Sequence, residues 1–384
     1  MVAAVRRGQS LRSVALDFGV SPATVLHWVR HASGQRLDRV DWSDRPHTPH
    51  HTRRTDADIE DLVLQLREGL RQHSDLGFYG AQLIRAALEQ RQVSPLPSVR
   101  TIGRILSRRG ALDGRKRVRR KPPPVGWYLP EVAAGKKELD SFDAVEGLKI
   151  KDGPLVEVLN GVSLHGGVVA SWPQEGCVTS AAVCEALLGF WQEFGLPGYA
   201  QFDNGTIFQG SHAHPDLVGR VSRLCLTLKV VPVFVPPRET GFQAAIESYN
   251  GSWQVRVWSR FLHTGLADLC ERSLRHVRAL RRHRAQRIEA APARRRFPKR
   301  WEMNLRQPLR GRLIYLRRTN GKGEVEVLGR QFAVDPRWPH RLVRAEVDLD
   351  RGTITFYRLR RREPADQPVI RVVEHRVRGS FVEE

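Results

Sequence analysis

Hydrophobic and polar positions alternate through the middle of the chain in a way that predicts a mixed α/β core. Runs typical of strands occur at 139–147, 155–159, 162–170, 199–202 and 230–235. Apolar residues recur at helical spacing over 179–194, about 214–227 and 242–261. The pair Asn160 and Gly161 is a strong signal for a tight turn between the second and third strands. The core is therefore expected to begin with three strands and then to alternate helices with strands.

Two short helical units precede this core. In the first, Ser10 and Ser21 are placed to cap helices, with Gly19 supplying the turn between them. The arrangement predicts a helix-turn-helix whose second helix enters the major groove of DNA. The side chains expected to face DNA are Thr24, His27, Arg30 and His31. The second helical unit, 55–112, also resembles a helix-turn-helix, with helices expected near 81–88 and 99–106. The alternative is a packing module between domains.

After the core the pattern changes twice. A helix over 266–288 is expected to bury one apolar face, formed by Leu266, Leu269, Leu274, Val277 and Leu280. Its other face is a basic stripe suited to a phosphate backbone, made of Arg275, Arg278, Arg281, Arg282 and Arg284. Short alternating runs from 313 to 359, separated by glycines, then predict a small β-barrel of about five strands.

The charge of the chain indicates what kind of partner it binds. The chain has 63 Lys and Arg against 41 Asp and Glu, a formal net charge of +22 at pH 7. Because the charge is clustered, a nucleic-acid partner is expected. The densest cluster precedes three prolines and is typical of an extended linker that follows phosphates. It consists of Arg115, Lys116, Arg117, Arg119, Arg120 and Lys121.

Membrane and zinc chemistry are not indicated. No apolar run approaches the roughly 20 residues needed to cross a bilayer, so a cytoplasmic protein without a membrane partner is expected. The cysteines Cys177, Cys184, Cys225 and Cys270 show no metal-ligand spacing. Reduced thiols and no zinc site are therefore expected, and the histidines near 47–51 are interpreted as part of a linker.

Three carboxylates are placed where metal-dependent phosphodiester chemistry needs them. Asp143 lies on a predicted strand, Asp203 directly follows one, and Glu247 lies on a predicted helix. Such chemistry can use two divalent cations about 3.5–4 Å apart, and Mg²⁺ prefers carboxylate oxygens. One Asp bridging two ions, with an Asp and a Glu on either side, meets this requirement. We therefore predict that Asp143, Asp203 and Glu247 are catalytic and bind two Mg²⁺ or Mn²⁺ ions.

The motifs around these carboxylates resemble those of the DDE transposases of bacterial insertion sequences, within the retroviral-integrase superfamily. The matching segments are Glu138-Leu139 before Asp143, Asp203-Asn204-Gly205 with Phe208, and 236–239 leading to 246–253. The resemblance covers nearly the whole chain. It implies a ribonuclease-H-like core, binding of transposon ends and target DNA, metal-dependent cleavage, and transfer of a 3′-hydroxyl into target DNA. It also implies a homo-oligomer on DNA, at least a dimer, in a bacterial, nucleoid-associated location.

Two positions remain open within the resemblance. Asp140 competes with Asp143 as the first ligand, and the spacing from Glu138-Leu139 favours Asp143. The interval between Asp203 and Glu247 is longer than in many relatives. Glu239 would shorten it, but it lies among prolines, whereas Glu247 lies on the helix three residues before Asn250. Glu247 is therefore the expected third ligand.

The predicted organisation is multidomain α/β. The expected parts are a helix-turn-helix at 1–35, a linker at 36–54, a second helical unit at 55–112, a basic linker at 113–135, a catalytic core at 136–263, an Arg-rich helix at 264–300, and the barrel with a tail at 301–384. A DNA transposase is the leading hypothesis. The alternatives are a catalytically silent, domesticated DNA-binding regulator of the same fold, and a ribonuclease-H-type nuclease. Terminal repeats, target preference and any accessory ATPase cannot be deduced from the sequence.

Overall fold

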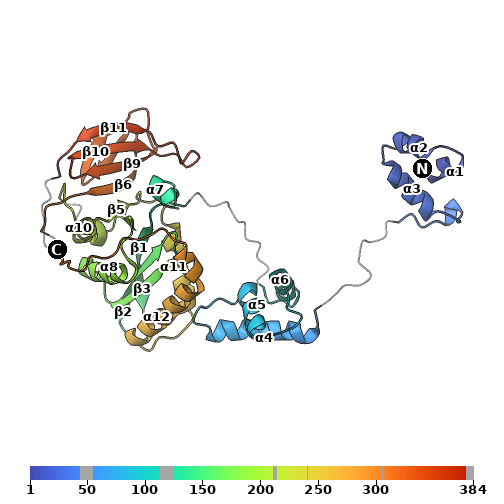
Figure 1. The fold of residues 1–384 in the computed structure, drawn as a ribbon, viewed down its shortest axis with the longest axis horizontal. Coiled ribbons are helices and arrows are strands. Elements are labelled where there is room, and N and C mark those ends of the chain that lie inside the picture. Colours follow the sequence, from blue (N-terminus) through green and yellow to red (C-terminus); the bar gives the residue numbers. More distant parts are fainter. Residues whose placement is uncertain (44–54, 113–124, 211–213, 240, 305, 378–384) are drawn as a thin grey trace. The chain divides into compact units, whose positions relative to one another are not determined.

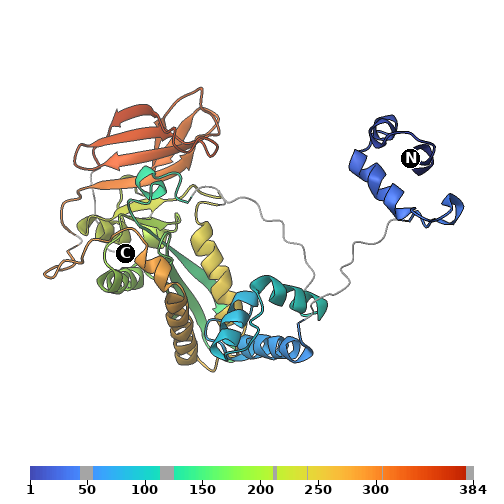
Figure 2. The same ribbon diagram turned by 45° about the vertical axis from the view of Figure 1, so that its right-hand side comes forward.

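The structure is a computed structural model that describes residues 1–43, 55–112, 125–210, 214–239, 241–304 and 306–377 (Figures 1 and 2). The chain divides into two compact units, Met1–Ala57 and Asp58–Glu384. The predicted first linker lies mostly outside the described residues. The whole basic cluster from Arg115 to Lys121 also lies outside them. Among the described helices, none combines the length and the apolar character needed to cross a membrane.

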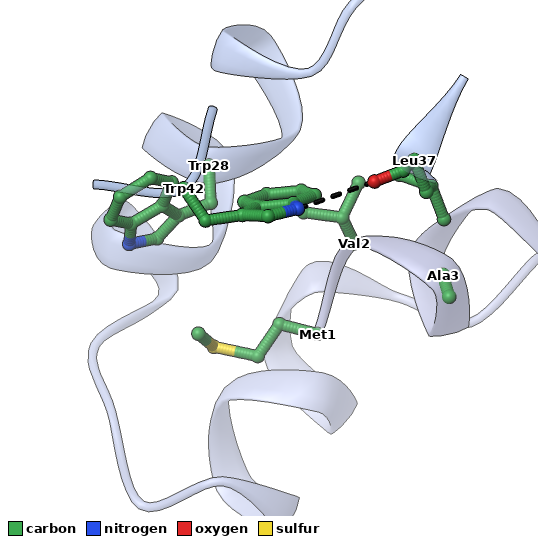
Figure 3. Close-up of a pocket in the computed structure, with 6 residues that line it drawn as sticks. All are labelled: Met1, Val2, Ala3, Trp28, Leu37 and Trp42. Atoms are coloured by element: carbon green, nitrogen blue, oxygen red, sulfur yellow. Dashed lines mark hydrogen bonds between the residues drawn. The ribbon is translucent and has the colours of Figure 1, made fainter. Parts of the chain in front are cut away.

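The first unit is built from short helices: α1 Val2–Arg6, α2 Leu11–Asp17, α3 Pro22–His31 and the 3-10 helix η1 Leu37–Arg39. The predicted caps are confirmed, because Ser10 Oγ accepts from the Ser13 N–H and Ser21 Oγ from the Thr24 N–H, each at 3.1 Å. Val14 and Val25 are fully buried between α2 and α3. Met1, Trp28 and Trp42 line a small apolar hollow of about 460 Å³ (Figure 3).

Three helices follow in the second unit: α4 Ala57–His73, α5 Ala81–Gln90 and α6 Val99–Arg108. They share a core that includes Ile84, Leu88 and Ile102, each fully buried. The predicted cap of α6 is confirmed, with the Thr101 N–H donating to Ser98 Oγ at 3.1 Å.

A nine-stranded sheet forms the body of the second unit, in the order β11-β10-β9-β6-β5-β4-β1-β2-β3. Its strands in chain order are β1 Leu139–Lys149, β2 Leu155–Ser163, β3 Val169–Glu175, β4 Tyr199–Phe202, β5 Val231–Phe234, β6 Arg312–Arg318, β9 Leu342–Asp348, β10 Thr353–Arg358 and β11 Val369–Glu374. The pairs β1–β4, β4–β5 and β5–β6 are parallel, and the others are antiparallel. The strands β7 Glu324–Val327 and β8 Arg330–Ala333 form a separate hairpin.

Helices cover both faces of the β1–β5 half of this sheet (Figure 1). One face packs against α8 Ser180–Phe194 and α10 Arg220–Thr227, near the short α9 Thr206–Gln209. The other packs against α11 Ala244–Trp253 and α12 Leu266–His283. The π-helix η2 Gln254–Trp258 continues α11, α13 Ala285–Glu289 follows α12, and α7 Pro130–Ala133 precedes β1. The mixed α/β core expected from the hydrophobic pattern is confirmed.

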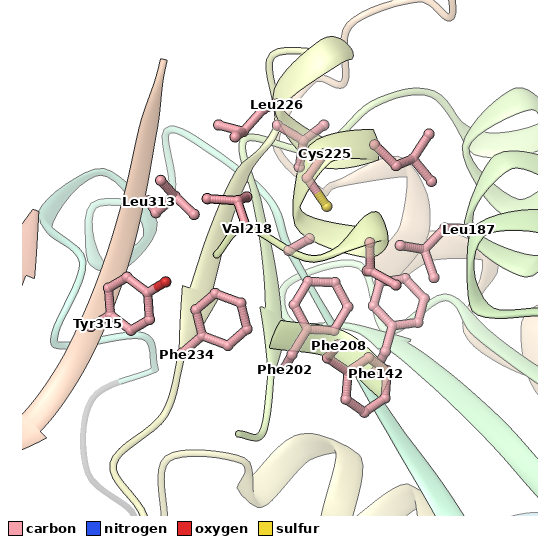
Figure 4. Packing of buried hydrophobic residues seen from close by; sticks show 14 of the residues in the cluster. Phe142, Leu187, Phe202, Phe208, Val218, Cys225, Leu226, Phe234, Leu313 and Tyr315 are labelled. Atoms are coloured by element: carbon pink, nitrogen blue, oxygen red, sulfur yellow. The ribbon is translucent and has the colours of Figure 1, made fainter. Parts of the chain in front are cut away.

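The C-terminal strands extend the core sheet. A row of rings crosses four neighbouring strands, from Phe142 through Phe202 and Phe234 to Tyr315 (Figure 4). The centroid distances along this row are 5.8, 6.2 and 5.1 Å. Aromatic contacts at these separations add to the stabilisation from burial. The strands β6, β9, β10 and β11 thus share one core with β1–β5, and a separate β-barrel is not confirmed.

The tight turn predicted at Asn160 and Gly161 is wrong. β2 runs straight through both residues, and the chain reverses only after Ser163. Gly161 lies opposite Phe142, and a Cβ at Gly161 would lie 2.8 Å from a carbon of the Phe142 ring. The glycine therefore makes room for a core ring. The Asn160 side chain is held by hydrogen bonds within the fold, as described below.

Two further expectations are corrected. Leu274 was expected on the buried face of α12 but is 46% exposed. Residues 125–135 were expected to be linker, yet Trp127, Tyr128 and Val132 are buried with Phe242 in a small core of their own. The segment before β1 is consequently part of the folded unit.

Gly161→Ala is expected to destabilise the second unit by about 1–3 kcal/mol, the usual cost of overpacking a dense core. Chemical denaturation followed by circular dichroism measures the change. Gly189→Ala, in the exposed face of α8 with no atom near the new methyl group, is the matched control. It should stabilise by up to about 1 kcal/mol through helix propensity. Equal stability of the two variants would contradict the packing argument.

Candidate active site

Asp143 lies in the middle of β1 on the face that α11 covers. Neighbouring residues on a strand point to opposite faces, so Phe142 points toward α8 while Asp143 points toward α11. Asp143 pairs with Asn160 of β2 in the strand register. Its side chain accepts a hydrogen bond of 2.8 Å from Asn250 Nδ2 on α11. The strand and the helix therefore jointly fix the position of this carboxylate.

The environment of Asp143 is unusual for an Asp. Burial and then the negative charge of Asp203, with a smaller effect from Glu247, raise the pKa of Asp143 to about 7. The hydrogen bonds from the Ala144 backbone and from Asn250 oppose this rise. The fold thus brings Asp203 and Glu247 within electrostatic range of Asp143. A positive charge placed among them would favour the ionised form of Asp143.

Asp203 sits at the end of β4 in a compact turn. Its Oδ1 accepts from the Gly205 N–H at 2.8 Å, and Asn204 Nδ2 donates to the Val235 carbonyl, just after β5, at 2.7 Å. These bonds anchor the turn to the neighbouring strand. The Asp203-Asn204-Gly205 segment is therefore a turn in local geometry, as its composition suggests. The turn leaves Asp203 half-exposed beside the buried end of the strand.

A chain of polar groups holds Asn250 in place. Asn160 Nδ2 donates to Asn250 Oδ1 at 2.9 Å, and Ser171 Oγ donates to Asn160 Oδ1 at 2.6 Å. Ser171 also lies 2.7 Å from the Tyr249 hydroxyl. Glu247 is one helical turn before Asn250, on the exposed part of α11. Sequence analysis missed Asn160 and Ser171. Asn160 stood inside an apparent turn signal, and no local pattern marks Ser171.

The two competing carboxylates occupy other places in the fold. Asp140 is completely buried on the α8 side. Its oxygens accept from Ser163 Oγ at 2.8 Å, from Trp191 Nε1 at 3.1 Å and from the Arg294 guanidinium at 2.5 and 3.0 Å. Glu239 pairs with Arg318 and lies 3.9 Å from Arg361. Glu138 is also buried, where it accepts from the N–H groups of His165 and Gly166 at 2.8 Å.

No group of three His, Cys, Asp or Glu side chains converges tightly enough to form a metal site within the described residues. The donor set nevertheless suits a hard cation, because Asp203 and Glu247 lie within electrostatic range of Asp143 and the pKa of Asp143 is raised. If divalent ions bind here, Asp143, Asp203 and Glu247 would be the residues that hold them. All four cysteines are free thiols, and Cys184 and Cys225 are buried.

The described residues that were predicted to contact DNA lie on the helices α3 and α12, and they differ in exposure. In α3, His27 and Arg30 are exposed. The Thr24 hydroxyl lies 2.8 Å from Oγ of the N-cap Ser21, and the His31 ring lies 2.8 Å from the Asp41 carbonyl. In α12, the exposed arginines are Arg275, Arg278 and Arg282, and Arg275 pairs with Glu271.

Two members of the predicted basic stripe turn inward. Arg281 Nε donates to the Val169 carbonyl and Arg284 Nη1 to the Gly167 carbonyl, both at 2.8 Å. Burial lowers the pKa of both arginines. The stripe expected along α12 is therefore divided between an outer face and a face that packs on β3.

Comparison with known proteins gives weak overall similarities. No known family profile matches the chain. The catalytic core domain of BIV integrase aligns at 18% identity over 35% of this chain and 80% of that one, with a TM-score of 0.27. The HTLV-2 integrase catalytic core domain in complex with magnesium aligns at 17% over 35% and 82%, with a TM-score of 0.28.

A longer alignment involves the simian T-cell lymphotropic virus intasome in complex with PP2A regulatory subunit B56 gamma. It covers 72% of this chain and 91% of that one, at 15% identity and a TM-score of 0.33. Every one of these scores is below 0.5, so function has to be inferred from the residues of this chain.

Proposed function

We propose that this protein is a DDE-type transposase that binds transposon ends, cleaves DNA strands and transfers a 3′-hydroxyl into target DNA. The observation that supports the proposal most directly is the environment of Asp143. A strand carboxylate with a raised pKa lies in the field of Asp203 and Glu247, and it is held by an asparagine one turn beyond Glu247. Structural carboxylates in folded proteins are usually paired with cations, as Asp140 is with Arg294.

In this proposal Asp143, Asp203 and Glu247 hold two Mg²⁺ or Mn²⁺ ions, which would activate the attacking oxygen and neutralise charge at the phosphate. Asn250 and Asn160 keep Asp143 directed toward α11, and the turn at Gly205 fixes Asp203. Arg275, Arg278 and Arg282 on α12, with His27 and Arg30 on α3, are proposed to contact DNA together with Thr24, His31 and the basic cluster at 115–121. The active form is proposed to be at least a dimer, because two transposon ends must be held together.

The second candidate is a DNA-binding regulator without catalysis. The observation that favours it is that, in the described part of the chain, no three side chains are gathered as a preformed metal site. On the first proposal, Asp143, Asp203 and Glu247 would come together only when substrate and ions bind.

Strand joining tests the proposal. Full-length protein, Mg²⁺ or Mn²⁺ and a labelled duplex carrying the element's end are incubated, and products are resolved on a denaturing gel. Wild type should nick and join DNA, whereas Asp203→Asn and Glu247→Gln should bind the same duplex but neither nick nor join it. Glu239→Gln is the matched control and should remain active. A wild-type protein that binds the end yet never cuts it with either metal would replace this proposal with the regulator.

A further inference from the structure

A cavity beside the carboxylates is lined by arginines. It has a volume of about 520 Å³ and lies on the face of the sheet that α11 covers. Ser141 of β1 and Gln201 of β4 line it, and each comes two residues before Asp143 or Asp203. Side chains two apart on a strand share a face. Cavities of about 300–1,000 Å³ are typical of small-molecule sites, so this one is large enough for a nucleotide-sized ligand.

Arg256, Arg284 and Arg287 line the cavity, and none of them forms an ion pair with an acidic side chain in the part of the chain that the structure describes. Within the described residues, the ion pairs of this region involve other arginines, such as Arg272, Arg275, Arg281 and Arg294. The partners of the cavity arginines are neutral: the Ser252 hydroxyl for Arg256, the Gly167 carbonyl for Arg284, and the carbonyls of 164 and 165 for Arg287. A guanidinium has five N–H donors, so most of these donors remain available to a ligand.

The positive charges in the cavity act on one another. Burial lowers the pKa of Arg256. Burial and then the charges of Arg287 and Arg256 lower the pKa of Arg284, although Tyr249 acts in the opposite direction. Cations that are partly removed from water without a counter-charge carry a desolvation cost. An anion in the cavity would offset that cost.

Unused hydrogen-bonding groups point to the same kind of ligand. Ser141 is 1% exposed, and its hydroxyl has no hydrogen-bond partner among the described residues. Gln243 also lines the cavity, and its Nε2 atom likewise has no hydrogen-bond partner among the described residues. Buried polar groups without partners are uncommon in folded proteins and need an explanation. Both donors belong to residues that line a basic cavity, and an acceptor-rich ligand such as a phosphate would satisfy them.

The remaining wall is apolar and aromatic. Trp127 and Phe242 line the cavity with their ring centroids 5.8 Å apart. Phe78 also lines it, and the Arg256 guanidinium carbon lies 4.0 Å from the centroid of the Phe78 ring. Inorganic phosphate alone would leave this wall unused, whereas a nucleotide has both a phosphate and a planar base.

We propose that this cavity binds a phosphate-bearing nucleotide, the terminal unit of a DNA strand held beside Asp143. Arg256, Arg284 and Arg287 contact the phosphate, Ser141 and Gln243 donate to it or to the sugar, and the base lies along the wall formed by Trp127 and Phe242. That the nucleotide belongs to a DNA strand rests on the proposed function, whereas nucleotide binding by the cavity does not.

Calorimetric titration of the full chain in EDTA tests the site without catalysis. The probes are inorganic phosphate, deoxyadenosine 5′-monophosphate and a 5′-phosphorylated single-stranded tetranucleotide, at high salt to screen the general positive field. The mononucleotide should bind at least tenfold more tightly than inorganic phosphate, and the tetranucleotide at least as tightly as the mononucleotide. Equal binding of phosphate and mononucleotide would overturn the nucleotide assignment. A tetranucleotide that binds more weakly than the mononucleotide would overturn the assignment to a DNA strand.

Three variants locate the binding. Arg256→Gln should weaken mononucleotide binding at least tenfold. Ser141→Ala should weaken it about threefold without lowering the melting temperature, because the hydroxyl has no partner in the protein. Arg351→Gln, the same charge change at an 83% exposed side chain in the turn between β9 and β10, is the control and should bind normally. If Arg351→Gln weakens binding as much as Arg256→Gln, or if Ser141→Ala binds as wild type does, the cavity is not the site.

The two proposals fail separately. A protein that binds the mononucleotide in this cavity but never joins DNA would contradict the transposase and leave the nucleotide site intact. A protein that joins DNA with Arg256→Gln and Ser141→Ala as well as wild type does, and that shows no mononucleotide binding, would overturn the cavity alone.

Discussion

Asp143→Asn is expected to abolish strand cleavage while making the metal-free protein more stable. The loss of activity should be at least about a thousandfold, on the order of 4 kcal/mol in the barrier, because a proposed ligand of both ions loses its charge. The gain in stability follows from the raised pKa of Asp143, about 7, compared with an ordinary value of 3.8. An asparagine of the same shape keeps an oxygen that can accept from Asn250 and removes the repulsion from Asp203 and Glu247.

The sign of the pH dependence follows from proton binding. Between about pH 4 and pH 7 the folded protein keeps a proton on Asp143 that the unfolded chain has already released. Stability should therefore fall as pH rises through this window, and the cost should persist above pH 7. At pH 8 the variant should be more stable than wild type by about 2 kcal/mol. This is about half of the free energy that corresponds to the whole pKa shift of Asp143, because each pKa unit corresponds to about 1.4 kcal/mol.

Urea denaturation in EDTA at pH 5 and pH 8 measures this difference, which should be several times larger at pH 8. In the presence of Mg²⁺ the order should reverse, because only wild type keeps all three ligands and gains stability from bound ions. A variant that is less stable than wild type at pH 8 without metal would show that Asp143 is not held against like charges.

Asp140→Asn, only three residues earlier, is expected to have the opposite effect on stability. Its carboxylate is fully buried and accepts two hydrogen bonds from Arg294, whose side chain is 11% exposed. Removing one partner of a buried ion pair leaves an uncompensated charge and typically costs about 3–5 kcal/mol. The second unit should accordingly unfold at a markedly lower urea concentration.

A double variant tests whether the loss of stability in Asp140→Asn comes from the unpaired charge of Arg294. Asp140→Asn with Arg294→Met removes both charges, and most of the lost stability should return, because an apolar replacement for a buried pair is often neutral. The protein with both changes should still bind and cleave end DNA. If Asp140→Asn instead folds with wild-type stability but cannot cleave, Asp140 is the first metal ligand and the assignment of Asp143 is wrong.

The sequence predicted correctly those features that depend only on residues close together in the chain, such as helix caps and the alternation of side chains along a strand. Ser10, Ser21 and Ser98 cap the expected helices because a cap involves only residues within one turn. The alternation of residues along β1 correctly separated Asp140 from Asp143 by face. Most strands of the core and of the C-terminal segment were located to within a few residues, because each has a period-two or continuous apolar pattern. The exception is the third strand, which was expected at 162–170 and is found at Val169–Glu175.

The features that the sequence did not predict depend on contacts between segments far apart in the chain. Asn160 and Gly161 have the composition of a turn, but the ring of Phe142 and the hydrogen bonds of Asn160 keep them in a strand. The partner of Asp140 is Arg294, far along the chain, and nothing in the local sequence identifies it. The inward direction of Arg281 and Arg284 depends on the carbonyl groups of Val169, the first residue of β3, and of Gly167, two residues before it. Pairing of β6 with β5 likewise depends on contacts between distant segments.

The pairing of β5 with β6 has a consequence for the protein while it is being made. β5 is complete at Phe234, whereas β6 begins only at Arg312. At about 5–20 residues per second, a ribosome needs between about 4 and 15 seconds to synthesise the roughly 80 residues between them. For that time the nascent chain presents an unpaired edge of β5 and the side of the Phe234 ring that Tyr315 later contacts, and an unpaired strand edge favours aggregation. The C-terminal strands therefore protect this edge only late in synthesis.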